Sequence, residues 1–174
     1  MDRSQRGADG PDAVPVRVAA RTVLVHETGL VLVQLHGGPH AVHWACPGGG
    51  VEGQESLREA ARRELLEEAG RQDAPGQELW TWEHDFAFDG RPVRQRETYF
   101  LARTDDLTLP AQDPDPVDGI LTRRWSSLEE LDRAPEPVWP PDLTTRLADV
   151  MNPSAWADPP FARASGRSGC RIRW

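Results

Sequence analysis

Residues 49–70 read GGVEGQESLREAARRELLEEAG, and in this stretch a glycine run leads directly into a helical pattern. Apolar residues recur at four-residue intervals from Leu57 onward, which predicts an amphipathic helix over residues 55–69. Gly49 and Gly50 carry no side chain, so the backbone before the helix can come close to a bound ligand. We therefore expect these glycines to contact the substrate.

Three glutamates interrupt the apolar stripe of this helix. At 100° per residue, Glu64 and Glu68 lie about 20° either side of Leu57, and Glu67 lies about 80° from it, at the edge of the stripe. Like charges three and four residues apart cost about 0.2–0.5 kcal/mol each on an exposed helix, and more in a partly buried cleft. A break of this kind in the binary pattern is expected at a functional site.

Either a nearby cation or full exposure can relieve this crowding. Arg58, Arg62 and Arg63 all lie outside the arc of the three carboxylates, although Arg63 can reach Glu55 or Glu59 on its own flank. A hard divalent cation fits better, because Mg²⁺ takes oxygen ligands and keeps waters that a phosphate oxygen can replace. The alternative is an acidic helix face in solvent, which is the usual place for a run of charges.

The spacing of the fixed residues favours the cation. From Gly49 to Gly70 it runs glycine, five residues, glutamate, seven residues, Arg-Glu-Leu, one residue, Glu-Glu, one residue, glycine. This pattern resembles the Nudix box, G-x5-E-x7-R-E-U-x-E-E-x-G-U, in which U is aliphatic. The segments WACPGGGVE and RRWSSLEEL also resemble segments of Nudix proteins, so the resemblance covers about residues 16–150.

The resemblance implies an α/β fold, a Nudix-type α/β/α sandwich around a mixed β-sheet. It also implies a pyrophosphohydrolase, in which water attacks a phosphorus of a nucleoside diphosphate that is linked to another group. Glu64, Glu67 and Glu68 match the metal ligands of the family, with the carbonyl of Gly48 as an implied fourth ligand. The implied cofactor is Mg²⁺, for which Mn²⁺ can substitute, and the implied partner is a small-molecule nucleotide substrate.

Two further box positions match the family and two depart from it. Arg63 and Glu55 match a pair that orients the metal-binding helix. The closing aliphatic position holds Arg71, which we expect to weaken the packing just past the helix. The preceding EGQE lacks the glycine that is often found before the box glutamate.

The general base is expected in a loop outside the box. In many relatives an acid before the late tryptophan-containing strand activates water or completes the metal site, and Asp118 occupies this region, seven residues before Trp125. Asp113 and Asp115 are neighbours that can substitute for it. Glu97, at the head of ETYFLA, is a further candidate.

Other residues allow more than one interpretation. Arg21 lies inside the first expected strand, where an unpaired charge is costly, so it either leaves the core sideways or binds phosphate. A set of alternating aromatic residues favours core or dimer surface over a base-stacking platform. This set comprises Trp80, Trp82, Phe86 and Phe88. Three loop histidines have irregular spacing, which argues against a zinc site. They are His36, His40 and His43.

Most of the remaining elements follow from turn residues and periodicity. Two hairpins are expected, one around HETG at residues 26–29 and one around DGRP at residues 89–92. HGGPHAVHWACPGGG, at residues 36–50, is expected to be a loop because of its Gly and Pro content. The segment ILTRRW, at residues 120–125, is expected to be a short strand.

Two short helices are expected to follow that strand. The first opens with Ser126 or Ser127 as N-cap and Glu129 or Glu130 three residues on. The second begins after two prolines within PPDLTTRLADVM.

The chain is expected to form one domain at residues 15–151, with a flexible arm at 1–14 and a disordered tail at 152–174. The tail holds four arginines and one aspartate, a net charge of +3. Cys46 and Cys170 are expected to be free thiols in a reducing compartment. With no apolar span and no apolar leader segment, the sequence predicts a cytoplasmic protein that does not enter a membrane.

The composition limits the partners. A formal charge of −8 argues against a general nucleic-acid binder. All 20 basic residues are Arg, which excludes a lysine Schiff base and a P-loop lysine. The resemblance makes a homodimer possible, since homodimers are common among Nudix proteins.

Two other functions stay open beside the hydrolase. One is a Nudix-derived sensor that binds its ligand without turnover, which the intact metal carboxylates disfavour. The other is an RNA 5′-end pyrophosphohydrolase, which the acidic balance disfavours and the Arg-rich tail favours. For a hydrolase, the box does not identify the substrate, so nucleoside triphosphates, ADP-ribose-like compounds and dinucleoside polyphosphates all remain candidates.

Overall fold

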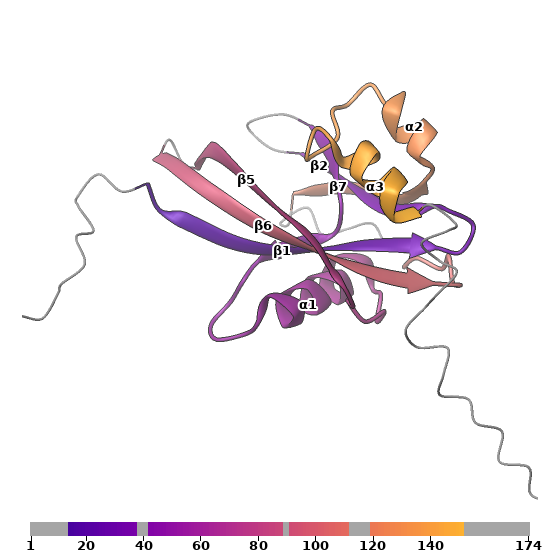
Figure 1. Cartoon of the computed structure of the whole chain (residues 1–174), viewed down its shortest axis with the longest axis horizontal. Helices are drawn as coiled ribbons and strands as arrows, with labels where there is room; N and C mark the ends of the chain where they lie inside the picture. Colours follow the sequence, from indigo (N-terminus) through magenta and orange to yellow (C-terminus); the bar gives the residue numbers. More distant parts are fainter. Residues whose placement is uncertain (1–13, 38–41, 89–90, 112–118, 152–174) are drawn as a thin grey trace, which may run out of the picture.

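The computed structural model describes residues 14–37, 42–88, 91–111 and 119–151, and at positions 87 and 88 the backbone alone. Within these ranges the chain forms seven strands and three helices (Figure 1). In order they are β1 Val16–His26, β2 Val31–His36, β3 His43–Ala45, β4 Gly48–Gly50, α1 Leu57–Ala69, β5 Glu78–Phe88, β6 Arg91–Thr104, β7 Ile120–Ser126, α2 Leu128–Asp132 and α3 Leu143–Met151.

The strands form one mixed sheet with β1 near its centre. β1 pairs parallel with β6 along its whole length, and β5 adds to β6 as the antiparallel partner of a long hairpin. The other half of the sheet is antiparallel, because β2 pairs with β3 and with β7. The first predicted hairpin is present, but β1 and β2 pair only at Val25 and Val31 beyond the turn and then separate.

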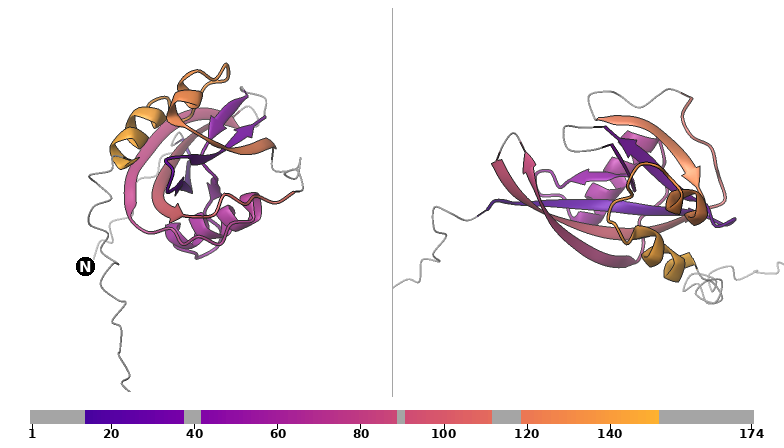
Figure 2. Two further views of the ribbon diagram at one scale, coloured as in Figure 1. Left: turned by 90° about the vertical axis from the view of Figure 1, so that its right-hand side faces the viewer. Right: turned by 90° about the horizontal axis from the view of Figure 1, so that it is seen from above.

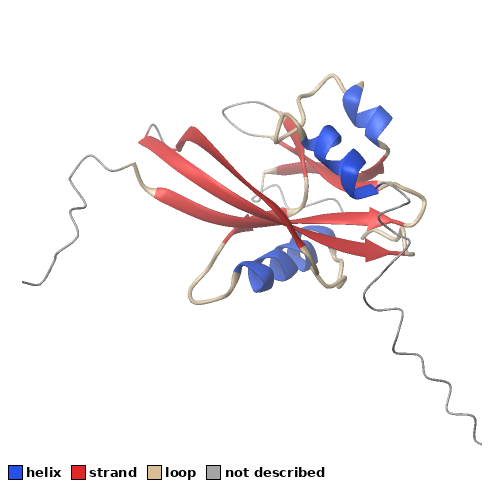
Figure 3. Cartoon of the chain, viewed as in Figure 1, coloured by secondary structure: helices blue, strands red, loops and turns tan. Residues whose placement is uncertain are grey.

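Helices cover both faces of the sheet, which confirms the predicted α/β/α sandwich (Figures 2 and 3). Successive residues of β1 point to opposite faces, and from Thr22 to His26 both sets are buried because each face has its own helical layer. Leu24 packs with Leu65 of α1 on one face. On the other face, Val23 packs with Leu143 and Leu147 of α3.

Side-chain caps define where the first two helices begin. Ser56 caps α1 and accepts from the amide of Glu59, whose side chain bonds back to the amide of Ser56. α1 therefore begins within two residues of its expected start. Ser127 and Glu130 form the same reciprocal cap on α2, which decides between the alternatives that the sequence left open.

Residues 36–50, predicted as a loop, contain two short strands, so that prediction was wrong. β3 pairs with β2, and the three glycines of β4 pair with residues 19–21 of β1. An all-glycine strand has no side-chain alternation from which it could be predicted. At Gly48 the backbone has φ +147, and an added Cβ would lie 2.3 Å from the carbonyl oxygen of Ala20. Glycine is therefore required where β4 meets β1.

The expectation for Arg71 was also wrong. Its side chain is 7% exposed and forms ion pairs with Asp73 at 2.8 Å and Asp106 at 2.9 Å. Its guanidinium also donates to Thr104 Oγ1 and to the carbonyl oxygen of Thr108. The long side chain thus joins the end of α1 to the segment after β6, a role that an aliphatic residue cannot fill.

Replacing Arg71 with leucine, the residue type that the family pattern specifies, is expected to destabilise the protein by about 1–3 kcal/mol. The reason is that the oxygen atoms around the guanidinium lose their hydrogen-bond donor. Thermal unfolding should show a lower melting temperature for the variant. Arg133→Leu is the matched control, because the Arg133–Glu129 pair is solvent-exposed and should change stability little. A higher melting temperature for Arg71→Leu would restore the view that Arg71 weakens the packing.

The predictions for the two ends of the chain fall on residues 1–13 and 152–174, outside the described ranges. Cys46 is a free, buried thiol, and burial raises its pKa to about 12. Cys170 lies outside the described residues. Every helix in the described ranges is too short or too polar to cross a membrane.

Candidate functional site

Two of the three clustered glutamates near the end of α1 line a pocket beside β4. The pocket has a volume of about 490 Å³ and its α1 side is formed by Glu64 and Glu68. Glu67 lies outside this lining, and its side chain is 58% exposed. We call the pocket beside β4 the polar pocket. Its lining residues are Arg17, Arg21, His36, Gly48, Gly49, Gly50, Val51, Glu52, Glu64 and Glu68.

Burial disfavours the charged form of two carboxylates in the polar pocket, those of Glu64 and Glu68. Burial raises the pKa of Glu68 to about 7, against the favourable effects of a hydrogen bond from the Gly48 amide at 2.8 Å and of Arg21 nearby. Burial also raises the pKa of Glu64, and the nearby charge of Glu67 adds to the effect while Arg63 opposes it. A bound cation would favour the charged form of both acids.

Arg63 supplies part of the missing positive charge. Its guanidinium donates to Glu55 at 2.7 Å and to the carbonyl oxygen of Gly50 at 2.9 Å. The other terminal nitrogen donates to Glu64 at 2.9 Å and to Glu67 at 3.0 Å. The pairing with Glu55 agrees with the sequence interpretation. The contacts with Glu64 and Glu67 correct it, because the helical angle of Arg63 ignored how far a long side chain reaches.

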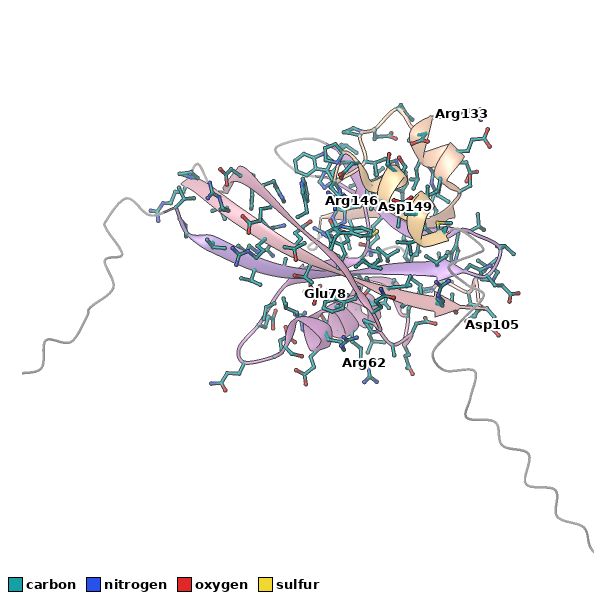
Figure 4. The ribbon with its side chains drawn as sticks, in the orientation of Figure 1. Arg62, Glu78, Asp105, Arg133, Arg146 and Asp149 are labelled. Atoms are coloured by element: carbon teal, nitrogen blue, oxygen red, sulfur yellow. The ribbon has the colours of Figure 1, made fainter. Side chains whose placement is uncertain are left out.

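Arg62 does not take part in this cluster. It is exposed and points away from the sheet on the far side of α1 (Figure 4). Arg58 is also directed elsewhere, because it donates to the carbonyl oxygens of Pro75 and Gly76. Arg63 is therefore the one arginine of α1 that neutralises the acids of the box.

The donor set at the polar pocket suits a hard divalent cation. Glu64, Glu68 and the Gly48 carbonyl present only oxygen atoms, which Mg²⁺ and Mn²⁺ prefer. Within the described ranges, no three acidic, histidine or cysteine side chains are already gathered as a metal site. Outside the pocket lining, Glu67 accepts a hydrogen bond from Arg63 at 3.0 Å, and the Gly48 oxygen also accepts from Arg21 at 3.1 Å.

Gly49 makes room for Glu64, and this gives a testable prediction. A Cβ at position 49 would lie 2.4 Å from Glu64 Oε1, so Gly49→Ala should displace the carboxylate. Because the displaced group is the end of a flexible side chain, stability should change little. Affinity for Mn²⁺, measured by calorimetry, should fall about tenfold or more. Gly53→Ala is the control for Mn²⁺ affinity, because nothing lies within 4 Å of its added Cβ; its φ of +54 disfavours alanine, so this variant should lose some stability and keep its Mn²⁺ affinity. Unchanged Mn²⁺ affinity in Gly49→Ala would exclude Glu64 as a ligand.

Arg21 neither leaves the core nor stays unpaired. Its side chain is 12% exposed and its Nε lies 2.8 Å from Glu97 Oε1, on a carboxylate that is 2% exposed. The guanidinium also donates to the carbonyl oxygens of Cys46 and Gly48. Arg21 is thus held in a buried ion pair whose cation reaches the edge of the polar pocket.

Glu97 is fully engaged by its neighbours. It accepts hydrogen bonds from Arg21, from Tyr99 Oη at 2.7 Å and from Gln95 Nε2 at 2.6 Å. Burial acts to raise the pKa of Glu97, but Arg21 and these hydrogen bonds hold it below the ordinary value. A carboxylate held in its charged form is a poor proton acceptor near neutral pH. Glu97 therefore fits a structural role better than that of general base.

The other base candidates cannot be placed. Asp113, Asp115 and Asp118 all fall in residues 112–118, outside the described ranges. Their role stays a prediction.

A second, larger pocket adjoins the polar one. It has a volume of about 610 Å³ and shares Arg17, Arg21 and His36 with the polar pocket. Six of its lining residues carry aromatic rings, so we call it the aromatic pocket. Its lining residues are Pro15, Val16, Arg17, Arg21, His36, Gly37, His43, Ala45, Trp82, His84, Phe86, Val93, Gln95, Glu97 and Trp139.

The rings of the aromatic pocket are packed against one another. Trp82 stacks on His84 with ring centroids 4.0 Å apart, and Trp139 meets both edge-on. His36 stacks on His43 at 5.4 Å. Burial lowers the pKa of His36 to about 3 and also lowers that of His84. Both imidazoles are therefore neutral at physiological pH, and the wall offers flat, uncharged rings on which another aromatic ring can stack.

The expected core position is confirmed for Trp80 and Trp82, which both pack against the core cluster, and Trp80 also stacks on Tyr99. Trp82 and Phe86 also line the aromatic pocket. His40 and the side chain of Phe88 lie outside the described residues.

Arg17 and Trp139 were not identified from the sequence. The sequence could have identified Arg17, because Arg17 and Arg21 are four residues apart and so share one face of β1. Trp139 carries no such signal, since it lies between α2 and α3 and reaches the pocket only through the fold.

Comparison with known proteins agrees with this geometry. The family model described as NUDIX domain matches residues 15–147. The chain belongs to the Nudix family. Among curated protein sequences none matches it.

Solved Nudix structures have the same fold. A MutT Nudix hydrolase from Burkholderia pseudomallei is 26% identical with a TM-score of 0.56, over 78% of this chain and 98% of the other. The MutT protein of Methanosarcina mazei is 21% identical with a TM-score of 0.62, over 80% and 97%. A C. elegans Ap4A hydrolase is 21% identical with a TM-score of 0.55, over 80% and 98%. At 21% identity the last two bear on the fold alone.

Proposed function

We propose that this Nudix protein is a divalent-metal-dependent pyrophosphohydrolase that cleaves the diphosphate linkage of a nucleoside diphosphate derivative. The observation that carries the proposal is the junction of the two pockets. An acidic, oxygen-lined pocket meets an aromatic one across Arg17, Arg21 and His36. Such a pair of pockets suits a ligand with a planar base at one end and a diphosphate at the other.

Each pocket then has a definite task. Trp82, His84 and Trp139 provide the surface on which the base stacks. Glu64, Glu67 and Glu68 would hold the cation, which supplies charge neutralisation at the phosphate and activation of the attacking water. Arg63 keeps these acids oriented toward β4 through its bonds to Glu55, Glu64 and Glu67. The glycines of β4 let the phosphates approach the backbone.

A product-release assay tests the proposal. The substrates are nucleoside triphosphates with and without an oxidised base, ADP-ribose and diadenosine tetraphosphate, each with Mg²⁺, with Mn²⁺ and with EDTA. We expect cleavage of one class, dependent on metal and lost in Glu64→Gln. Glu129→Gln is the matched control, because Glu129 is an exposed acid on α2. Nucleotide binding by calorimetry without turnover on any substrate would contradict the hydrolase and favour a sensor.

A further inference from the structure

Three guanidinium groups surround β4, and two of them are already neutralised. Arg63 is paired with Glu55, Glu64 and Glu67. Arg21 is paired with the buried carboxylate of Glu97. Arg17 is different, because within the described ranges its hydrogen bond goes to the neutral amide of Gln95 and no carboxylate lies in ion-pair range. Arg17 is thus a cation at the site whose charge is available to a ligand.

The position of Arg17 is fixed from two sides. Its Nη1 donates to Gln95 Oε1, and the amide nitrogen of Gln95 donates to Glu97, so the acceptor that holds Arg17 is itself anchored. Its Nη2 lies against Gly50, where a Cβ would come within 2.9 Å of it. The guanidinium is therefore held against the glycine strand, with further donors left for another group.

Arg17 lies where the two pockets meet. It lines both the polar pocket, with Glu64 and Glu68, and the aromatic pocket, with Trp82 and His84. A ligand that extends from one pocket into the other must pass this guanidinium. An anion at this boundary would contact Arg17 on the side of the aromatic pocket. On the side of the polar pocket it would contact the cation that the glutamates would hold.

We propose that Arg17 is a substrate-binding residue that holds the diphosphate of the ligand at the boundary of the two pockets, with Gln95 as its positioning residue. The inference rests on the proposed function and goes beyond it by assigning this role to a residue outside the Nudix box. A planar guanidinium can donate two parallel hydrogen bonds to phosphate oxygens. Arg17 therefore strengthens the binding of a nucleotide and leaves the binding of a nucleoside, which has no phosphate, unchanged.

Equilibrium binding in EDTA tests the assignment without turnover. Adenosine, guanosine, cytidine and uridine are each compared with the corresponding 5′-diphosphate by following tryptophan fluorescence, since Trp82 and Trp139 line the pocket. The wild-type protein should bind at least one diphosphate more tightly than its nucleoside. In Arg17→Gln this preference should fall about tenfold or more, with nucleoside affinity unchanged. Gln95→Leu should lose part of the preference, and Arg17→Lys should keep part of it.

Arg96→Gln is the matched control. Arg96 is exposed, adjoins Gln95 in sequence, and pairs with Glu83 on the opposite face of β6. Its removal changes the net charge equally and should leave the preference intact. An unchanged preference in Arg17→Gln, or an equal loss in Arg96→Gln, would overturn the assignment while the proposed function stands. If the wild-type protein in EDTA binds no diphosphate more tightly than its nucleoside, the assignment fails. The proposed function is judged separately by the product-release assay with metal, so the two failures can be told apart.

Discussion

Glu68→Gln is expected to lower kcat by about a hundredfold or more, which is at least the loss that removal of an outer-shell partner of a metal ligand causes. Glutamine has nearly the same shape and can still accept the hydrogen bond from the Gly48 amide, so the fold should survive. The substitution removes the negative charge of Glu68 from the polar pocket. The loss of kcat is measured by steady-state kinetics at saturating Mg²⁺, with Glu129→Gln as the control.

The same variant makes a prediction about stability and pH. The pKa of Glu68 is raised from 4.5 to about 7, so between these pH values the folded, metal-free protein holds a proton that the unfolded chain releases. The contribution of Glu68 to stability therefore falls as pH rises through this range. Glutamine does not titrate. In EDTA, Glu68→Gln should gain about 3 kcal/mol over the wild type between pH 4 and pH 8.

Denaturant unfolding at several pH values measures this difference. If the free energies of unfolding of the two proteins change in parallel with pH, the pKa of Glu68 is not raised in the metal-free folded protein. An active Glu68→Gln would be evidence against a role for this carboxylate in the reaction, whatever its pKa.

Glu97→Gln is expected to cost about 3 kcal/mol or more of folding stability, because it leaves the buried charge of Arg21 without its counterion. The amide can still accept hydrogen bonds from Tyr99 or Gln95, so the loss reports mainly on the charge. Denaturant unfolding at pH 7 provides the measurement.

A double-mutant cycle separates the pair from its surroundings. In Arg21→Met with Glu97→Leu the buried pair is replaced by apolar groups, and the double variant should be clearly more stable than the sum of the two single losses predicts. Arg94→Gln is the surface control. Arg94 and Asp85 are 48% and 59% exposed, so their ion pair should contribute less than about 1 kcal/mol to stability. Additive losses at positions 21 and 97 would mean that the two charges are not coupled.

Local spacing was enough to predict the box helix and to limit the N-cap of α2 to Ser126 or Ser127. The apolar repeat placed α1 and the Ser-x-x-Glu pattern indicated the start of α2, because both signals lie within a single turn or two of helix. The pairing of Arg63 with Glu55 also followed from the box. Spacing failed at β4, where glycines carry no pattern, and at Arg71, whose partners include an acid 35 residues away.

By itself, then, the sequence placed the box helix and its clustered glutamates, because these depend on periodicity and on residues close together in the chain. The resemblance of the box to Nudix proteins implied the family and the layered α/β architecture. Only the tertiary structure decided how the charges are distributed at the site. Parallel pairing of β1 with β6 brings Arg21 to Glu97, 76 residues away, and Arg17 to Gln95, 78 residues away. Which arginine is neutralised and which is left for a ligand depends on strand register, and no local pattern in the chain encodes that register.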